Sequence, residues 1–361
     1  MRWLTEFADA ARKTDRLTGS PDHTALLAAG LMGEAGSVLT ELKKQERELQ
    51  AYPAYRRRML EELGDFLWYF VRLVTALDKP LLNEFAVTAA PGVSQGRLSS
   101  LPLFLEFGAA VGDILKMLGK DDSVRRAEER RALLGRVWEL LCAISEKSRV
   151  SLKAAADGNL RKIESRWPTE RLYAPLFDSE FAEEEQLPRR LQMEFRERSH
   201  GEQKVVILRC NGINFGDRLT DNIHDPDGYR YHDIFHFAHA VHLGWSPVVR
   251  ALLRCKRKSN SQIDEAEDGA RAVILEEAVS AVVFARAKQL NFFEGLDHLD
   301  YDLLKTVSHF VEGYEVERVP LWQWEAAILE GYAIFRKLRT NCGGSVVLNL
   351  EQHELKYISV A

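Results

Sequence analysis

Apolar residues recur at helical spacing along most of the first half of the chain. The pattern predicts two long helices between Leu26 and Leu77, joined by a short polar loop. Further helices are predicted within residues 1–20, 101–118, 132–144 and 151–166. The glycine- and serine-rich stretch from Ala90 to Ser100 predicts a loop. The first half is therefore expected to be all-α.

The second half is expected to be mainly helical, with a small β-element. The stretch from Tyr229 to Leu243 has helical periodicity and ends before Gly244. Two stretches, Lys204–Arg209 and Ser345–Ile358, predict strands that could join the two ends of this half in a small sheet. The fold class expected from the whole pattern is all-α, with this β-element as a minor addition.

Proline and charge indicate a boundary between two domains. Trp167-Pro168 ends a predicted helix, and Phe177–Arg198 is interrupted by proline and highly charged, which is typical of a linker. We expect a first domain at residues 1–175, a linker at 176–200 and a second domain at 201–361. The chain has 361 residues, of which 46% are hydrophobic, and this is enough for two cores.

Acidic side chains interrupt the apolar stripes of the two long helices. Glu34 and Glu41 lie on the stripe of the first helix, and Glu62 and Asp65 lie three residues apart on the second. Two such helices packed antiparallel would bring the carboxylates to one point, and carboxylate oxygens are the ligands that Mg2+ prefers. Glycines next to these acids predict close approach between helices. They are Gly33, Gly36 and Gly64.

One face of the predicted helix 151–166 carries an amide and two cations. Asn159, Lys162 and Arg166 recur there at spacings of three and four residues. Such a face is either ordinary solvated helix surface or a phosphate-binding face, because Arg presents a planar fork to phosphate oxygens and Lys a point charge.

Several motifs within residues 1–170 are shared with a known family. They are Gly33-Glu34-Ala35-Gly36-Ser37, Lys43-Lys44, Glu61-Glu62-Leu63-Gly64-Asp65, Trp68-Tyr69 and Asn159-Leu160-x-Lys162-x-x-x-Arg166. Together they resemble the MazG-like family of all-α nucleoside triphosphate pyrophosphohydrolases. The resemblance implies a four-helix domain that binds Mg2+, or Mn2+ in its place, through Glu-x-x-Glu and Glu-x-x-Asp motifs.

The activity that this resemblance implies is hydrolysis of a nucleoside or deoxynucleoside triphosphate between its α and β phosphates. The implied metal ligands are Glu34, Glu62 and Asp65, with Glu41 in reserve. The implied catalytic residues are Glu34, Glu62, Asp65, Lys162 and Arg166, and the implied substrate-binding residues are Asn159, Lys162 and Arg166. Four-helix sites of this kind bury their apolar faces against a partner, so a homodimer or higher homo-oligomer is expected.

Ser37 departs from the family pattern, because it stands where the family has the second glutamate of the first motif. A serine hydroxyl is neutral, so the metal site would lack one charge. Glu41 could supply that charge from the next helical turn. The alternative is a catalytically weakened module that binds or senses nucleotides without turning them over.

The second half contains a cluster of potential metal ligands. His232, His236 and His239 share one helix face with Asp233 beside them, and Glu277 interrupts the apolar stripe of a later helix, directly after Glu276. These are either satisfied core histidines or a second metal or phosphate site. The candidate second site consists of His232, Asp233, His236 and Glu277.

The second half is also similar to the helical extension found after some MazG-like domains. A third interpretation, in which this half is a histidine-aspartate metal phosphohydrolase, rests on His232-Asp233 alone. Its further histidine and aspartate partners are not clearly spaced in the sequence.

Charge and composition limit the classes of binding partner and the cellular location that we expect. The formal net charge is -5, which argues against a dedicated nucleic-acid-binding surface. The basic run Arg254–Ser259 is interpreted as solvated surface at a helix end. Four scattered cysteines indicate reduced thiols, and no apolar run is as long as a membrane span. We therefore expect a cytoplasmic protein without membrane contact.

Overall fold

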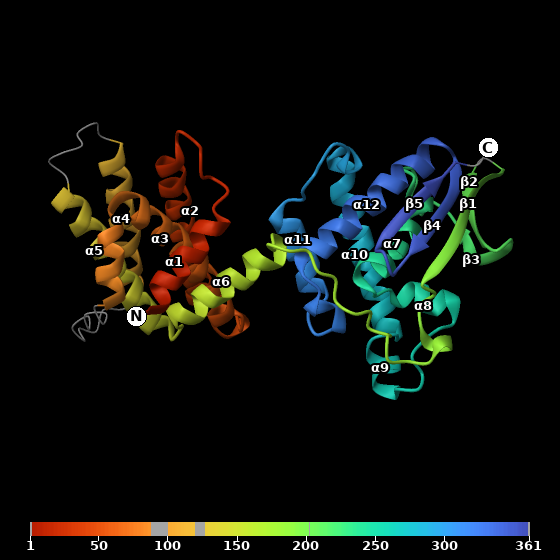
Figure 1. The fold of residues 1–361 in the computed structure, drawn as a ribbon, viewed down its shortest axis with the longest axis horizontal. Helices are drawn as coiled ribbons and strands as arrows, with labels where there is room; N and C mark the ends of the chain where they lie inside the picture. The colour runs from red at the N-terminus through yellow and green to blue at the C-terminus, as the bar shows by residue number, and fades with distance from the viewer. Residues whose placement is uncertain (1, 88–99, 120–126, 202, 360–361) are drawn as a thin grey trace. The chain divides into compact units, whose positions relative to one another are not determined.

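The structure is a computed structural model that describes residues 2–87, 100–119, 127–201 and 203–359. The chain divides into two compact units, Met1–Trp167 and Pro168–Ala361, here called unit 1 and unit 2 (Figure 1). Of the loop predicted from Ala90 to Ser100, all but the last residue lies outside the described residues.

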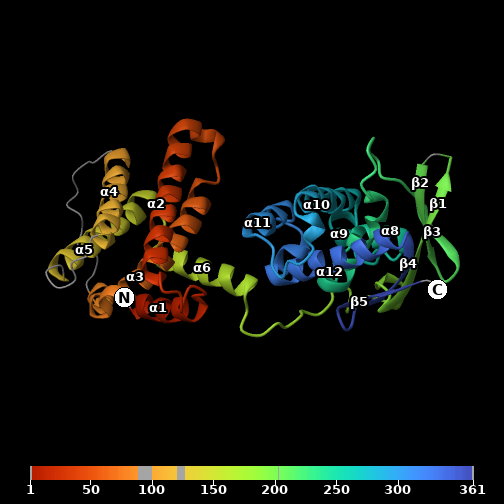
Figure 2. The ribbon, with the colours of Figure 1, turned by 90° about the horizontal axis from the view of Figure 1, so that it is seen from above.

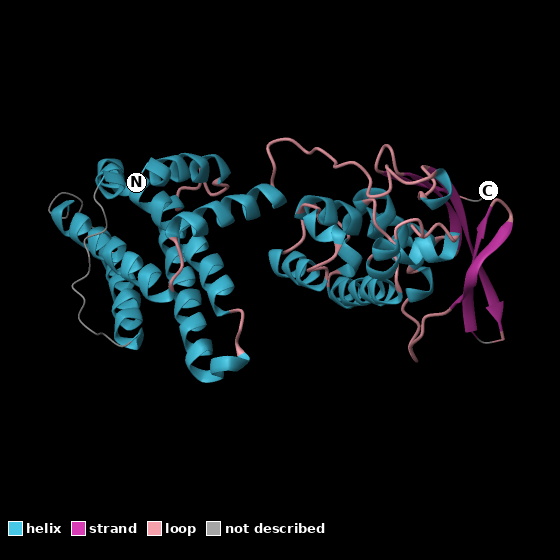
Figure 3. Ribbon diagram, turned by 90° about the horizontal axis from the view of Figure 1, so that it is seen from below, coloured by secondary structure: helices cyan, strands magenta, loops and turns pink. Residues whose placement is uncertain are grey.

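The described part of unit 1 consists of helices joined by loops (Figure 3). Its elements are α1 (Arg2–Thr14), α2 (His23–Glu48), the 3-10 turn η1 (Leu49–Ala51), α3 (Tyr55–Val87), α4 (Ser100–Leu118), α5 (Ala127–Ser148) and α6 (Leu152–Arg166). Each helix predicted from the spacing is present, although the described residues form six α-helices where the family resemblance implies four. Helix α3 is central, because it packs against α1, α2, α5 and α6.

The apolar stripes of α2 and α3 form the core of unit 1. Leu27, Leu31 and Val38 of α2 are fully buried, and so are Leu63 and Phe66 of α3. These residues belong to the stripes that the sequence pattern predicts. The apolar stripe therefore determines which face of each helix points inward. It also determines on which side of the helix the neighbouring acidic side chains lie.

Helix α3 is kinked near its end. Asp78 has non-helical backbone angles, and Pro80 follows two residues later. Proline lacks an N–H group and disfavours helical geometry in the residue before it, which explains a break at this point. The Asp78 carboxylate accepts a hydrogen bond from the Leu81 N–H at 3.2 Å, so it caps the segment after the kink.

Helix α2 together with η1 is long and apolar enough, by length and composition alone, to cross a membrane. Core helices have the same properties, and Leu27, Leu31 and Val38 of this helix pack within unit 1. The absence of a membrane span therefore stays a prediction.

Unit 2 combines a sheet with helices. Its strands are β1 (Arg190–His200), β2 (Gln203–Cys210), β3 (Ile213–Leu219), β4 (Gly343–Asn349) and β5 (Glu354–Ile358). Within the described residues they form one antiparallel sheet in the order β3-β2-β1-β4-β5. Strand β1 is central, since Phe195 lies opposite Leu208 of β2 on one side and Gly344 of β4 on the other.

The sheet shows that the all-α prediction is wrong for this chain. The two predicted strand regions do form strands at the two ends of unit 2 and share one sheet, but β1 and β3 were not foreseen. Strand β1 lies in the stretch 176–200 that was expected to be a linker. Its charges suggested a linker, but Met193 and Phe195 alternate with Glu194 and Arg196 and are buried, which is the pattern of a half-buried strand.

Helices cover one face of the sheet (Figure 2). They are α7 (Asp233–Leu243), α8 (Pro247–Leu253), α9 (Ser261–Ala266), α10 (Ala270–Gln289), α11 (Tyr301–Phe310) and α12 (Leu321–Thr340), with 3-10 turns η2 (Glu183–Glu185), η3 (Tyr229–Tyr231), η4 (Asn291–Phe293) and η5 (Glu315–Arg318). Helices α7 and α12 contact β4 and β5. Every residue of α7 is buried, so its histidines lie in the interior of unit 2.

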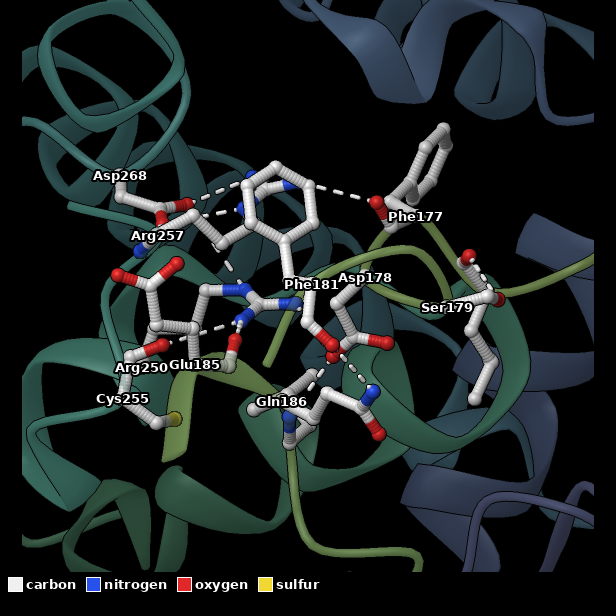
Figure 4. A network of polar contacts seen from close by, with 12 residues as sticks. Phe177, Asp178, Ser179, Phe181, Glu185, Gln186, Arg250, Cys255, Arg257 and Asp268 are labelled. Carbon is white, nitrogen blue, oxygen red and sulfur yellow. Dashed lines mark hydrogen bonds and ion pairs between the residues drawn. The ribbon is translucent and has the colours of Figure 1, made fainter. Parts of the chain in front are cut away.

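The segment before β1 is also anchored in unit 2 (Figure 4). The Arg250 Nη2 atom lies 2.7 Å from the Asp178 carboxylate, and Nη1 donates to the Glu185 carbonyl at 2.9 Å. Arg257 binds the Asp268 carboxylate at 2.7 Å and is fully buried. The interpretation of the basic run as solvated surface is therefore wrong at Arg257, and residues 178–185 pack as part of the domain.

Candidate metal centres

Three carboxylates meet between α2 and α3 in unit 1. The ligand atoms of Glu34, Glu62 and Asp65 all lie within 4.8 Å of one another. Glu34 comes from α2, and the other two lie one turn apart on α3. All three are partly exposed, so solvent reaches the group. The convergence predicted from the two interrupted stripes is present in the structure.

Helix α6 supplies two contacts to this group. The Asn159 Nδ2 amide donates to Asp65 Oδ1 at 2.7 Å, and the Lys162 ammonium contacts both oxygens of the same carboxylate. The Asn159 side chain is buried, and its amide oxygen has no hydrogen-bond partner among the described residues. An amide and a cation predicted to face phosphate therefore lie directly beside the predicted metal ligands.

Gly64 permits this contact between α3 and α6. A Cβ at position 64 would lie 2.5 Å from the Ala155 carbonyl oxygen and 3.1 Å from the Asn159 Cβ. The predicted close approach is therefore present here. It is absent at Gly33 and Gly36, where an added Cβ would meet no described atom within 4 Å.

Arg166 lies at the end of α6 and contacts an aromatic ring. Its guanidinium carbon is 4.2 Å from the centre of the Trp167 ring, and that of Arg16 is 4.9 Å from the same ring. Arg166 therefore has an aromatic neighbour that the motif alone does not reveal.

Glu41 does not belong to the carboxylate group. It is buried, lies 2.6 Å from the Lys44 ammonium and accepts a hydrogen bond from the Tyr52 hydroxyl. Burial, and then the nearby Glu41, raise the pKa of Tyr52. The expectation that Glu41 is a reserve metal ligand is thus at odds with its position, because its oxygens are engaged elsewhere.

Tyr69, which belongs to the shared Trp68-Tyr69 motif but was not predicted to be a site residue, is a neighbour of the group. It follows Asp65 by one helical turn, and its ring packs against Gly30 of α2. Burial raises the pKa of the Tyr69 phenol, and the charges of Glu34 and Asp65 raise it further. The i, i+4 spacing from Asp65 is the signal that could have found it.

A second cluster lies in the interior of unit 2, between α7 and α10. Two sets of ligand atoms, each within 4.8 Å, share His236: one contains His232 and Asp233, the other His239 and Glu276. Here we call these residues, together with Glu277, the histidine–carboxylate cluster. His239 and Glu276 were not in the predicted second site. His239 lies one helical turn after His236, and Glu276 directly precedes Glu277, and both of these residues were predicted.

Glu277 completes this cluster from the solvent side. Its oxygens lie 3.4 Å from His236 Nε2 and 3.9 Å from His232 Nε2, and its side chain is 43% exposed. Burial alone would lower the pKa of His236, but Glu276 and Glu277 raise it well above its usual value. Burial lowers the pKa of His232. The four predicted residues of the second site are therefore brought together.

A family model described as the MazG C-terminal domain matches residues 172–361, which is more than half of the 361-residue chain. The matched range lies within unit 2 and contains the whole histidine–carboxylate cluster. No curated protein and no solved structure matches the chain.

Proposed function

The chain belongs to the family of the MazG C-terminal domain, and on this premise we propose that it is a nucleoside triphosphate pyrophosphohydrolase with its active site in unit 1. The reaction is hydrolysis of an NTP or dNTP between the α and β phosphates, giving a nucleoside monophosphate and pyrophosphate. The family match supports a relation to MazG proteins through unit 2. The position of the active site rests on the motifs within residues 1–170 and on their geometry.

The observation that carries the proposal is the meeting of Glu34, Glu62 and Asp65 beside Lys162. Three carboxylates so close together repel one another unless a cation lies between or beside them. Lys162 supplies one positive charge to Asp65, and a divalent ion would offset more of the negative charge of the group. All-oxygen ligands suit Mg2+, with Mn2+ as a substitute.

The residues present fit such an ion and its substrate. Bound Mg2+ would polarise the phosphate and lower the pKa of the attacking water. Lys162 and Arg166 offset the charge that develops on the leaving pyrophosphate. Asn159 orients the substrate, and its unpartnered amide oxygen is a buried acceptor that a water or a ligand N–H would satisfy.

Ser37 favours a second candidate, a nucleotide-binding module with weakened catalysis. It lies on α2 one turn after Glu34 and adds no charge to the group. Under this second candidate function, the ion binds through Glu34, Glu62 and Asp65 alone, and the nucleotide is bound without rapid turnover.

A homodimer is part of the proposal. Leu101 and Leu105 are one turn apart on α4 and are each 57% exposed, so a second copy of the chain could cover them. We also propose that the protein acts in the cytoplasm. Light scattering during size-exclusion chromatography tests the dimer, and a monomeric mass contradicts it.

The activity is tested with the purified chain, Mg2+ and a panel of ribo- and deoxyribonucleoside triphosphates. Pyrophosphate and monophosphate in equal amounts support the proposal and identify the preferred base and sugar. Orthophosphate as the main product contradicts it. Saturable nucleotide binding without any product supports the second candidate.

A further inference from the structure

We propose that the histidine–carboxylate cluster of unit 2 binds a divalent transition-metal ion through His232 Nε2, His236 Nε2, Asp233 and Glu277. This site is separate from the carboxylate group of unit 1 and does not depend on the activity proposed there.

Both histidines have an oxygen atom close to Nδ1 and carboxylate oxygens close to Nε2. His232 Nδ1 lies 2.9 Å from the Tyr229 carbonyl oxygen, and His236 Nδ1 lies 3.0 Å from Glu276 Oε1. A metal-binding histidine almost always gives its other ring N–H to a carbonyl or a carboxylate, which fixes the tautomer that leaves the ligating nitrogen unprotonated. His232 has such a contact at Nδ1, and His236 has a carboxylate of the required kind at ion-pair distance from Nδ1.

The distances among the proposed ligand atoms suit a bound ion. His232 Nε2 is 3.3 Å from Asp233 Oδ1, and the Nε2 atoms of His232 and His236 are 3.9 and 3.4 Å from oxygens of Glu277. Ligands about 2.1 Å from a tetrahedral ion are about 3.4 Å apart. The ligand atoms therefore already stand at nearly the separation that coordination requires.

His236 gives a second, independent sign of a ligand. It is 1% exposed, and neither ring nitrogen makes a hydrogen bond with any described residue. The 3.0 and 3.4 Å approaches to Glu276 and Glu277 are ion-pair contacts. A buried polar group without a hydrogen bond costs about 1–3 kcal/mol. An ion at Nε2 removes that cost.

Glu276 is held as a supporting acceptor for the ligands. Its carboxylate accepts from the Ser246 hydroxyl at 2.8 Å and from the Val248 N–H at 2.9 Å, at the start of α8, and lies 3.0 Å from His239 Nδ1. These contacts fix the carboxylate that faces His236. We therefore place Glu276 and His239 behind the ligands, where they orient the rings.

The ligand set favours a transition metal over Mg2+. Imidazole nitrogen suits Zn2+, Fe2+, Ni2+ and Cu2+, whereas Mg2+ takes oxygen ligands. Because the Glu277 side chain is 43% exposed, water can reach the ion from that side. Two nitrogen and two oxygen ligands complete a tetrahedral site, and a water on the solvent side would bind as a fifth ligand.

The test measures metal content in the full chain carrying Asp65→Asn, so that the unit 1 group contributes little. After incubation with Zn2+ and dialysis, we expect about one bound ion per chain. In the same background, His232→Gln with His236→Gln should abolish this binding. Co2+ in place of Zn2+ should give the visible absorption of nitrogen- and oxygen-ligated cobalt, and the double substitution should remove it.

Two further variants keep the test decisive. Glu277→Gln changes a half-exposed side chain, so it should leave the fold intact and weaken Zn2+ binding at least about ten-fold. His242→Gln is the matched control, because His242 lies on the same helix and is equally buried but pairs with Glu330. It should keep the ion. The proposal is overturned if the chain binds no Zn2+ or Co2+, or if Glu277→Gln and the double variant bind as well as the control.

Discussion

The Lys162 ammonium contacts both carboxylate oxygens of Asp65, joining α6 to α3 at the point where three acids meet. Under the proposed function, the lysine is bound to a metal ligand and is also the cation that would bind the phosphate of the substrate. We therefore expect metal and lysine to compete for Asp65 in the absence of nucleotide, and to cooperate once phosphate gives the lysine another anionic partner.

Lys162→Met tests this competition. Without the ammonium group, no cation competes with the metal for Asp65, which keeps its hydrogen bond from Asn159, so Mn2+ should bind more tightly in the absence of nucleotide. Turnover should fall at least about ten-fold, because the charge on the leaving group is no longer offset. Calorimetric Mn2+ titration and steady-state rates measure the two effects. Lys153→Met, on the exposed side of the same helix, is the control. Equal Mn2+ affinity of Lys162→Met and Lys153→Met would contradict the proposed competition.

Ser37→Glu should lower the Mg2+ concentration needed for the half-maximal rate, since it adds a carboxylate one turn from Glu34. Glu41→Gln should leave that concentration unchanged and instead reduce thermal stability, because Glu41 is buried against Tyr52 and Lys44. Rates measured for each variant over a series of Mg2+ concentrations test both expectations. If Glu41→Gln raised the Mg2+ requirement, Glu41 would be a metal ligand after all.

Gly64→Ala should separate α3 from α6. The added methyl would lie 2.5 Å from a backbone oxygen of α6, so that helix must shift, at a cost of about 1–3 kcal/mol. The shift also moves Asn159 and Lys162 away from Asp65, so activity should fall with stability. The matched change Gly33→Ala meets no described atom within 4 Å and should add up to about 1 kcal/mol through helix propensity. Unfolding in urea measures the stability of both variants. Equal free energies of unfolding for Gly64→Ala and Gly33→Ala would contradict the packing argument.

Glu197 should make the stability of unit 2 depend on acid. Burial alone would raise the pKa of this carboxyl, but contacts from Lys204, Tyr231 and Arg230 lower it to about 2. A carboxyl with a lowered pKa stabilises the fold above its unfolded pKa, near 4.5, and that contribution disappears as the pH falls towards 2.

Glu197→Gln should therefore cost on the order of 3 kcal/mol at pH 7 and progressively less below pH 4.5. Unfolding in urea at several pH values measures the difference. Glu194→Gln, on the same strand, should change stability little at any pH. A Glu197→Gln penalty that stays constant down to about pH 2 would show that the ion pairs are not its source.

The helices and the meeting of the acids in unit 1 could be predicted because both follow from local periodicity. The stripe of α2 and the stripe of α3 each fix one inward face, and Glu34, Glu62 and Asp65 flank those faces. The glycines predicted close approach between helices less reliably than the apolar stripes predicted the inward faces. Gly64 meets α6, whereas Gly33 and Gly36 face open space, and only the position of a third helix separates these cases.

The parts that could not be predicted depend on partners far away in sequence. Strand β1 was taken for a linker because its charged positions dominate its composition, and its pairing partner β4 begins more than a hundred residues later. Arg257 lies in a basic run but is buried, because Asp268 and Glu315 neutralise it. Glu276 and His239 likewise acquire their role only when α7 packs against α10.

The most direct test of the central claim is a comparison of pyrophosphate release by three forms of the full chain. Wild type, Asp65→Asn and Asp157→Asn are incubated with Mg2+ and the preferred triphosphate. Asp157 is the control, because it lies on exposed α6 surface and pairs with Lys153. We predict equal release by wild type and Asp157→Asn, and loss of at least about a hundred-fold in Asp65→Asn with helical content unchanged. Undiminished release by Asp65→Asn would place the reaction elsewhere and contradict the account.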